Sequence, residues 1–171
     1  PVFFRLSRIA IAYSFGGLWL HIMVTHYKSG LAKFYRKIYP FAALIILVFE
    51  AGALYAQLVK SGLKVVEYFF ILVWVIAVAA AILLLILKAK AHQPIAVLIC
   101  AAAVFSVLPL AGYHALPVAA QVDRLENLLV KQGMLENGRL IPASAEPGSA
   151  VRESITDAVY YLANAEDAKL P

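Results

Sequence analysis

The sequence predicts an all-α protein, a polytopic transmembrane helix bundle of about four spans followed by a small C-terminal helix-hairpin-helix soluble segment. Of its 171 residues, 63% are hydrophobic and 15% are charged, whereas an average soluble domain is about 45 to 50% apolar and about 25% charged. Residues 1–113 hold ten Lys or Arg and two acids, a balance of +8, while residues 114–171 hold five and eight, a balance of −3. The composition therefore divides the chain into a transmembrane region, 1–113, and an amphipathic C-terminal segment, 114–171.

Four apolar runs predict the spans, and short polar segments separate them. About 20 helical residues at 1.5 Å each cross a bilayer core about 30 Å thick. Apolar residues surround each predicted helix instead of forming one stripe, as expected when the solvent is lipid. The predicted spans are residues 9–27, 38–59, 65–87 and 94–113.

Basic residues between the first two runs predict contact with lipid. Lys28, Lys33, Arg36 and Lys37 lie there among apolar and aromatic residues, so we expect them to bind anionic headgroups. With the lysines of residues 88–90 they make six cations on one side of the membrane against four on the other. The excess of Lys and Arg in cytoplasmic loops then places the C-terminal segment outside the cytoplasm.

The C-terminal segment has the pattern of a small soluble module. Apolar residues recur every three to four positions from 117 to 132, which predicts an amphipathic helix with Gly133 as its C-cap. Asn137-Gly138 between short apolar runs predicts a hairpin, and a second amphipathic helix is expected at about 150–163. Because so few apolar residues make a marginal domain, we expect it to pack on sequence outside this chain, on the membrane surface or on another protein.

Glu50 is the most informative single residue, because an acid in the middle of a span costs several kcal/mol unless it is protonated, paired or facing water. At 1.5 Å per residue it lies about 16 Å deep, level with Trp74 and Ser106. The group is either an ion, proton or polar-substrate site, or a carboxyl whose hydrogen bonds lock the bundle. His21, the deepest histidine, is a further intramembrane candidate for a proton or ligand role.

Several function classes lack their motifs. Cys100 has no partner cysteine in the sequence, so neither a disulfide nor a Cys-based metal site is available. The histidines lack the spacing of a metal pair, and we expect neither metal nor cofactor. Nucleophile elbows, phosphate-binding glycine loops and paired carboxylates are also missing. Cations clustered between apolar runs favour the lipid bilayer as partner over nucleic acid.

The order of features resembles one bacterial family. The basic segment 34–40, the connector 61–69 and, above all, residues 121–129 (QVDRLENLL) and 133–141 (GMLENGRLI) are similar to the domain of unknown function 4153 family. The resemblance implies a longer multi-pass protein of the bacterial cytoplasmic membrane, with more helices upstream and an extension beyond Pro171. It brings no catalytic residues. Residues 107–113 depart from the family, which has an aromatic, glycine-containing sequence there.

The leading functional prediction is a non-enzymatic integral membrane protein that anchors a small extracytoplasmic module, which contacts envelope components or a partner protein. Upstream helices or another membrane protein would complete the bundle. The alternative is a transporter or ion-coupled subunit that uses Glu50 as an intramembrane carboxylate. A membrane enzyme acting on lipid-linked substrates is disfavoured, since no polar cluster converges at one depth.

Overall fold

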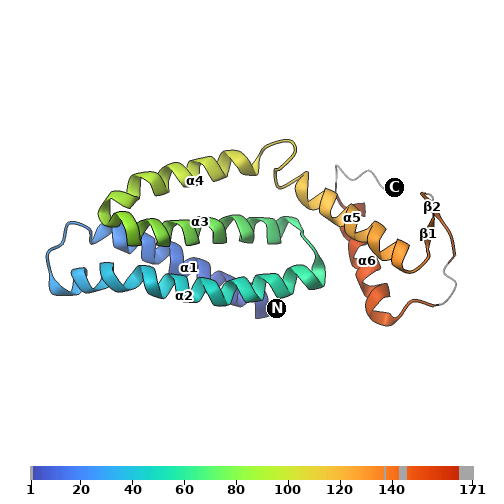
Figure 1. Cartoon of the computed structure of the whole chain (residues 1–171), viewed down its shortest axis with the longest axis horizontal. Helices are drawn as coiled ribbons and strands as arrows, with labels where there is room; N and C mark the ends of the chain where they lie inside the picture. The colour runs from blue at the N-terminus through green and yellow to red at the C-terminus, as the bar shows by residue number, and fades with distance from the viewer. Residues whose placement is uncertain (1, 137, 143–145, 166–171) are drawn as a thin grey trace. The chain divides into compact units, whose positions relative to one another are not determined.

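The computed structural model describes residues 2–136, 138–142 and 146–165, with side chains from Ser7 onward, and it is mostly helical (Figure 1). The chain forms two compact units, Pro1–Ala56 with Phe69–Ser106, and Gln57–Tyr68 with Val107–Pro171. The elements are α1 (Val2–Met23), α2 (Gly30–Ser61), α3 (Val65–Leu87), the 3-10 helix η1 (Lys88–Ala91), α4 (His92–Ser106), α5 (Leu116–Lys131), β1 (Leu135–Glu136), β2 (Arg139–Leu140) and α6 (Ser149–Ala163).

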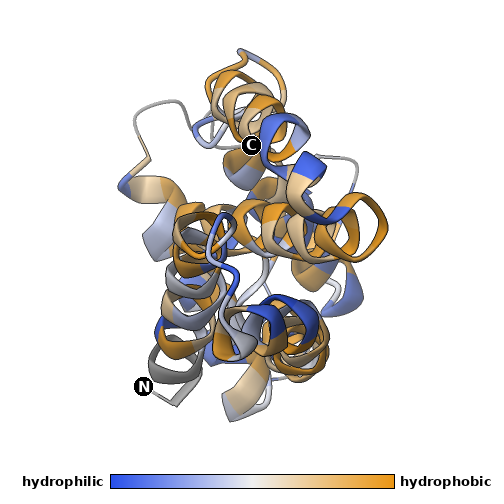
Figure 2. Cartoon of the chain, turned by 90° about the vertical axis from the view of Figure 1, so that its left-hand side faces the viewer, coloured by the Kyte–Doolittle hydropathy of each residue, from blue (hydrophilic) through white to orange (hydrophobic). Residues whose placement is uncertain are grey.

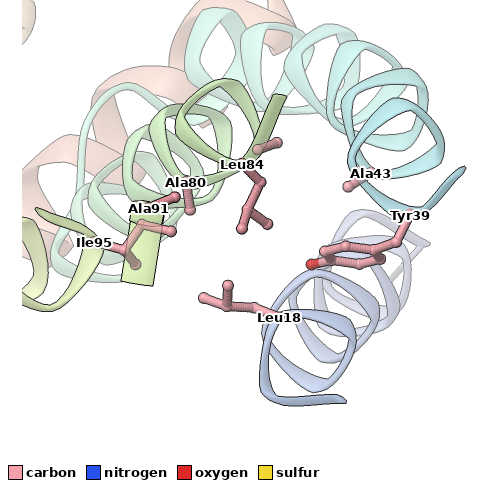
Figure 3. Close-up of a cluster of buried hydrophobic side chains, with 8 residues drawn as sticks. Leu18, Tyr39, Ala43, Ala80, Leu84, Ala91 and Ile95 are labelled. Carbon is pink, nitrogen blue, oxygen red and sulfur yellow. The ribbon is translucent and has the colours of Figure 1, made fainter. Parts of the chain in front are cut away.

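The first unit has one hydrophobic core to which α1, α2, α3, η1 and α4 all contribute. Figure 3 shows its side chains pointing toward a common centre, with the Tyr39 ring lying between α1 and α2. Half of the members are alanines, which let helices approach closely. The buried members are Leu18, Tyr39, Ala43, Ala80, Ala81, Leu84, Ala91 and Ile95.

Only one face of each long helix in this unit is buried. Apart from Pro40, which follows Tyr39 directly, the buried residues of α2 recur at intervals of three, four or seven residues, the period of a single helical stripe: Ala32, Tyr39, Ala43, Leu47, Glu50 and Leu54. The other faces expose large apolar side chains, such as Phe49 at 77% and Ile86 at 69%. Figure 2 shows apolar residues around the helices and hydrophilic ones gathered near turns.

Within the part of the chain that the structure describes, two stretches are long and apolar enough to cross a membrane, Gly30–Ser61 and Val65–Ser106. The second comprises α3, η1 and α4, and the chain reverses direction at η1 (Figure 1). The predicted count of about four spans is not supported. The run 94–113 in particular gives a helix of only 15 residues, about 22 Å long. It ends at Ser106 because Pro109 disfavours helical backbone at the residue before it.

The second unit contains the predicted module. Two amphipathic helices, α5 and α6, pack together through Leu125, Leu129, Ala158 and Leu162. Backbone bonds from Gly133 to Val130 and from Met134 to Leu129 end α5 in a Schellman motif, with Gly133 at φ +63°, so the predicted cap is confirmed. The hairpin is confirmed as well, since Leu135 pairs with Leu140 and Glu136 with Arg139. Asn137 lies outside the described residues.

The same unit also includes the α2–α3 turn, residues 60–64, on which α5 and α6 pack. This face of the module therefore packs on a turn of its own chain, more than fifty residues upstream of α5. The expected packing of the module on sequence outside this chain, on the membrane surface or on another protein stays a prediction. Periodicity along α5 shows an apolar face without showing what covers it.

Candidate functional site

Glu50 lies inside the first unit, 7% exposed. It lines a small space with Ser14 of α1 and Trp74 of α3, so the structure brings together two of the residues that the depth count placed at one level. The Trp74 indole Nε1 donates to the carbonyl of Leu47, one turn before Glu50, at 2.8 Å. The space is only about 10 Å³, which is room for about one water.

Ser106 is not part of that group, because its hydroxyl donates to the carbonyl of Ala103 in its own helix at 2.7 Å. Ser14 behaves differently. Its Oγ is buried and has no hydrogen-bond partner among the described residues. Ser14 of α1 thus brings a buried hydroxyl without a partner among the described residues to the space that Glu50 lines, whereas the sequence predicts a hydrogen bond from this hydroxyl to a backbone carbonyl.

His21 pairs with His92, a contact that no sequence pattern predicts. Its Nδ1 lies 3.3 Å from Nε2 of His92, which opens α4, and the rings are in edge-to-face orientation with centroids 5.5 Å apart. His21 itself is 2% exposed. A hydrogen bond between two imidazoles needs one ring nitrogen to donate and the other to accept, so this pair joins the last turn of α1 to the start of α4 only while the acceptor nitrogen carries no proton.

Gly17 allows α1 and α2 to approach closely. A Cβ at this position would lie 2.1 Å from Cε2 of Tyr39, so no other residue fits without displacing the ring. The Tyr39 hydroxyl donates to the carbonyl of Ser14, and the Tyr35 hydroxyl donates to that of Gly17 at 2.9 Å. Two stacked tyrosines of α2 thereby hydrogen-bond to backbone carbonyls of α1.

The four predicted headgroup cations have different roles. Arg36 donates through Nη1 to the carbonyls of Val24, Thr25 (3.1 Å) and Tyr27 (2.9 Å), so it caps the C-terminal end of α1, where carbonyls lack helical partners. Arg36 thus has a structural role in the described residues, and its contact with a lipid headgroup stays a prediction. Lys28 is exposed in the loop, while Lys33 and Lys37 are exposed on the first turns of α2.

A second cluster of polar contacts holds the module to the α2–α3 turn; we name it the turn clasp and define it by Gln121, Arg124, Asp157 and Lys64. The Gln121 amide, 0% exposed, donates to the carbonyls of Ser61 (2.9 Å) and Leu63 (3.0 Å). Arg124 donates to the carbonyls of Ser61 and Lys60, both at 2.8 Å. The carbonyls left free where α2 ends are thus satisfied by side chains of α5.

Gly62 completes the turn clasp. It adopts φ +68°, the left-handed conformation that ends helices, and its amide donates to Leu58 at 2.8 Å. A Cβ here would lie 2.7 Å from Nε2 of Gln121 and 2.8 Å from Cδ of Arg124. Glycine is needed both for the backbone angle and for the space that the two α5 side chains occupy.

Asp157 of α6 supplies the charge in the turn clasp. Its carboxylate accepts from Lys64 at 2.6 Å and from Arg124 at 3.3 Å. Partial burial acts to raise the pKa of Asp157, but hydrogen bonds and charge from Lys64 and then from Arg124 outweigh it and hold the pKa below its ordinary value. Since 38% of the Asp157 side chain is exposed, the ion pairs are screened and contribute less than about 1 kcal/mol each.

A further buried acid, Glu67, lies in the first turn of α3 and is 2% exposed. Gln57 donates to its Oε1 at 3.0 Å, while Oε2 has no hydrogen-bond partner among the described residues. Sequence reasoning passed over Glu67. The available signal was an acid in a first helical turn, where the helix dipole favours negative charge.

Sequence reasoning also missed the roles of Gln121 and Arg124. Their three-residue spacing places both on one face of α5, and both belong to the segment that carries the family resemblance. Their partners are backbone carbonyls, which leave no trace in residue types. No protein-family model, curated protein or solved structure matches this chain, so the resemblance to the domain of unknown function 4153 family stays a prediction.

Proposed function

We propose that this chain is a non-enzymatic integral membrane protein of a bacterial cytoplasmic membrane, whose helices α1 to α4 lie in the bilayer and anchor the α5-hairpin-α6 module outside the cytoplasm. The observation that carries the proposal is low burial in the most apolar segments. In the most apolar 18 residues of Gly30–Ser61, only 22% of the residues are buried, and in those of Val65–Ser106 only 28% are buried. The core helix of a soluble protein would be mostly buried, so lipid is the solvent that accounts for the remaining apolar faces.

The module is the part of the proposal that meets other molecules. The hydrophobic core of the module is small. The turn clasp joins the module to the end of α2 through backbone carbonyls, which are present whatever residue type occupies the position. Apolar side chains remain exposed on it, among them Leu140 at 71% and Tyr160 at 72%. These are the residues through which we propose that the module contacts envelope components or a partner protein.

Cysteine labelling tests both the membrane location and the orientation. In a background with Cys100→Ala, single cysteines replace Glu136 in the module and Lys28 in the loop between α1 and α2. Three proposed spans separate the two positions, so a membrane-impermeant maleimide added to intact cells should label E136C and leave K28C unlabelled until lysis. Equal labelling of both positions, or release of the protein by alkaline carbonate, would refute the proposal.

An ion-coupled subunit is the second candidate, and one observation favours it: the buried hydroxyl of Ser14 has no partner among the described residues and lines the same space as Glu50. Against it, that space holds about one water. Proton flux in proteoliposomes, followed with a pH-sensitive dye, distinguishes the two. Glu50→Gln abolishes flux if the carboxyl carries protons, whereas a protein with no flux before or after the substitution leaves only the structural role.

A further inference from the structure

A cavity of about 540 Å³ in the first unit concentrates positive charge; we name it the basic pocket. Lys33 and Lys37 reach it from the first turns of α2, and Lys88 reaches it from η1, more than fifty residues further along the chain. Arg36 lies beside them while capping α1. The described residues that line the pocket include no Asp or Glu, so its charge is not neutralised from within and an anion is the complementary ligand.

Apolar side chains also line the basic pocket, and we name them the apolar wall: Pro40 and Phe41 of α2 and Leu84 and Leu85 of α3. Phe41 is 54% exposed. A free inorganic anion would gain nothing from this wall. An amphiphile would place its charged head against the lysines and the start of its chain against Phe41 and Leu85, as small-molecule sites combine apolar walls with few polar groups.

Of the two lysines in η1, Lys88 lines the pocket and also has an unusual backbone conformation. Lys88 has φ +52° and is the one residue other than glycine with a positive φ among those described. Side-chain-bearing residues rarely adopt this conformation, and such strain concentrates at binding sites. Lys90, two positions later in η1, is exposed and does not line the pocket.

We propose that the basic pocket binds the phosphate group of an anionic phospholipid, with Lys33, Lys37 and Lys88 around the phosphate and the acyl chain along the apolar wall. The inference rests on the proposed function, because the lipid must come from a bilayer around α2 and α3. It also goes beyond diffuse attraction to headgroups. In diffuse attraction each surface lysine contributes alike, at about 1 kcal/mol, whereas in a built site only the lining lysines count.

Two double variants separate these cases, since each removes one lysine from residues 28–37 and one from η1. K33A/K88A removes two pocket lysines, and K28A/K90A removes two outside it. The full chain in detergent is titrated with phosphatidylglycerol, and the bound fraction is measured by native mass spectrometry, with phosphatidylcholine as the neutral lipid. We expect K33A/K88A to weaken binding about thirtyfold, which corresponds to about 2 kcal/mol, and K28A/K90A to weaken it less than about threefold.

Equal weakening in the two variants would overturn the built site. K33R/K88R keeps both charges and should bind within about threefold of the natural chain, so a loss there would contradict charge as the cause. Inorganic phosphate as competitor identifies the source of the anion, since displacement at millimolar concentration would assign the pocket to free phosphate and overturn the lipid. If K33A/K88A stays in the membrane after carbonate treatment and binds phosphatidylglycerol as tightly as the natural chain does, the inference alone fails. If the natural chain is itself extracted by carbonate, the proposed function fails.

Discussion

Replacing Gln121 by Ala should open the turn clasp. The side chain is 0% exposed and donates to two backbone carbonyls, at 2.9 Å and 3.0 Å. Each hydrogen bond contributes about 0.5 to 1.5 kcal/mol, and a buried acceptor left without a donor costs about 1 to 3 kcal/mol. Arg124 still reaches one of the two carbonyls, that of Ser61, so the expected loss is about 2 to 4 kcal/mol for docking of the module on the α2–α3 turn.

Amide hydrogen exchange of residues 57–68 in the full chain measures this loss, because local opening free energies set the exchange rates. A loss of about 2 to 4 kcal/mol corresponds to exchange about 30 to 900 times faster. Asn127→Ala is the matched control, since Asn127 is an exposed amide on the same helix that bonds only to Asp123 within α5, at 2.8 Å. If both variants accelerate exchange by less than about threefold, the clasp hydrogen bonds do not hold the module and the reasoning is refuted.

Two further substitutions probe the same contact. Gly62→Ala and Gly133→Ala impose similar backbone strain, at φ +68° and +63°, but of these two only the Cβ at position 62 meets other atoms, 2.7 Å from Nε2 of Gln121. G62A should therefore accelerate exchange of residues 57–68 at least about tenfold more than G133A does. Equal effects of the two substitutions would argue against a packed turn. Because the folded pKa of Asp157 is depressed, its contribution is complete above the ordinary pKa of about 3.9 and disappears as the pH falls through the folded value. Protonation removes both ion pairs of Asp157, so docking should weaken by less than about 2 kcal/mol between pH 6 and pH 2. D157N should remove that part of the pH dependence, as measured by the same exchange rates.

The helical elements followed closely from the sequence. The predicted run 65–87 coincides with α3, and the second amphipathic helix, Gly133 cap and hairpin lie where periodicity and turn chemistry placed them. These features depend on neighbours within a few residues, so the sequence contains the causes of their formation. The ends of the apolar runs were less predictable: hydropathy continues through residues 107–113, but Pro109 ends the helix earlier.

The candidate sites depended on distant contacts. Pairing of His21 with His92 joins residues 71 positions apart, and Gln121 recognises carbonyls about 60 positions upstream. The basic segment 28–37 predicts headgroup contacts for all four of its cations. The structure shows that Arg36 caps α1, whereas Lys33 and Lys37 line the basic pocket. Of the two residues that the depth count placed level with Glu50, Trp74 lines the same small space, whereas the Ser106 hydroxyl bonds within its own helix. One coordinate along a helix leaves the direction of the side chain open.

By itself the sequence determined the helical class of the protein, the long apolar segments, and the amphipathic faces of its module, since composition and period follow directly from residue order. The tertiary structure decided that the module packs on the α2–α3 turn, which polar groups meet inside the first unit, and which lysines line one pocket. The physical reason is that these contacts depend on backbone carbonyls, which every residue type carries, and on side-chain directions, which are set only when distant segments pack together.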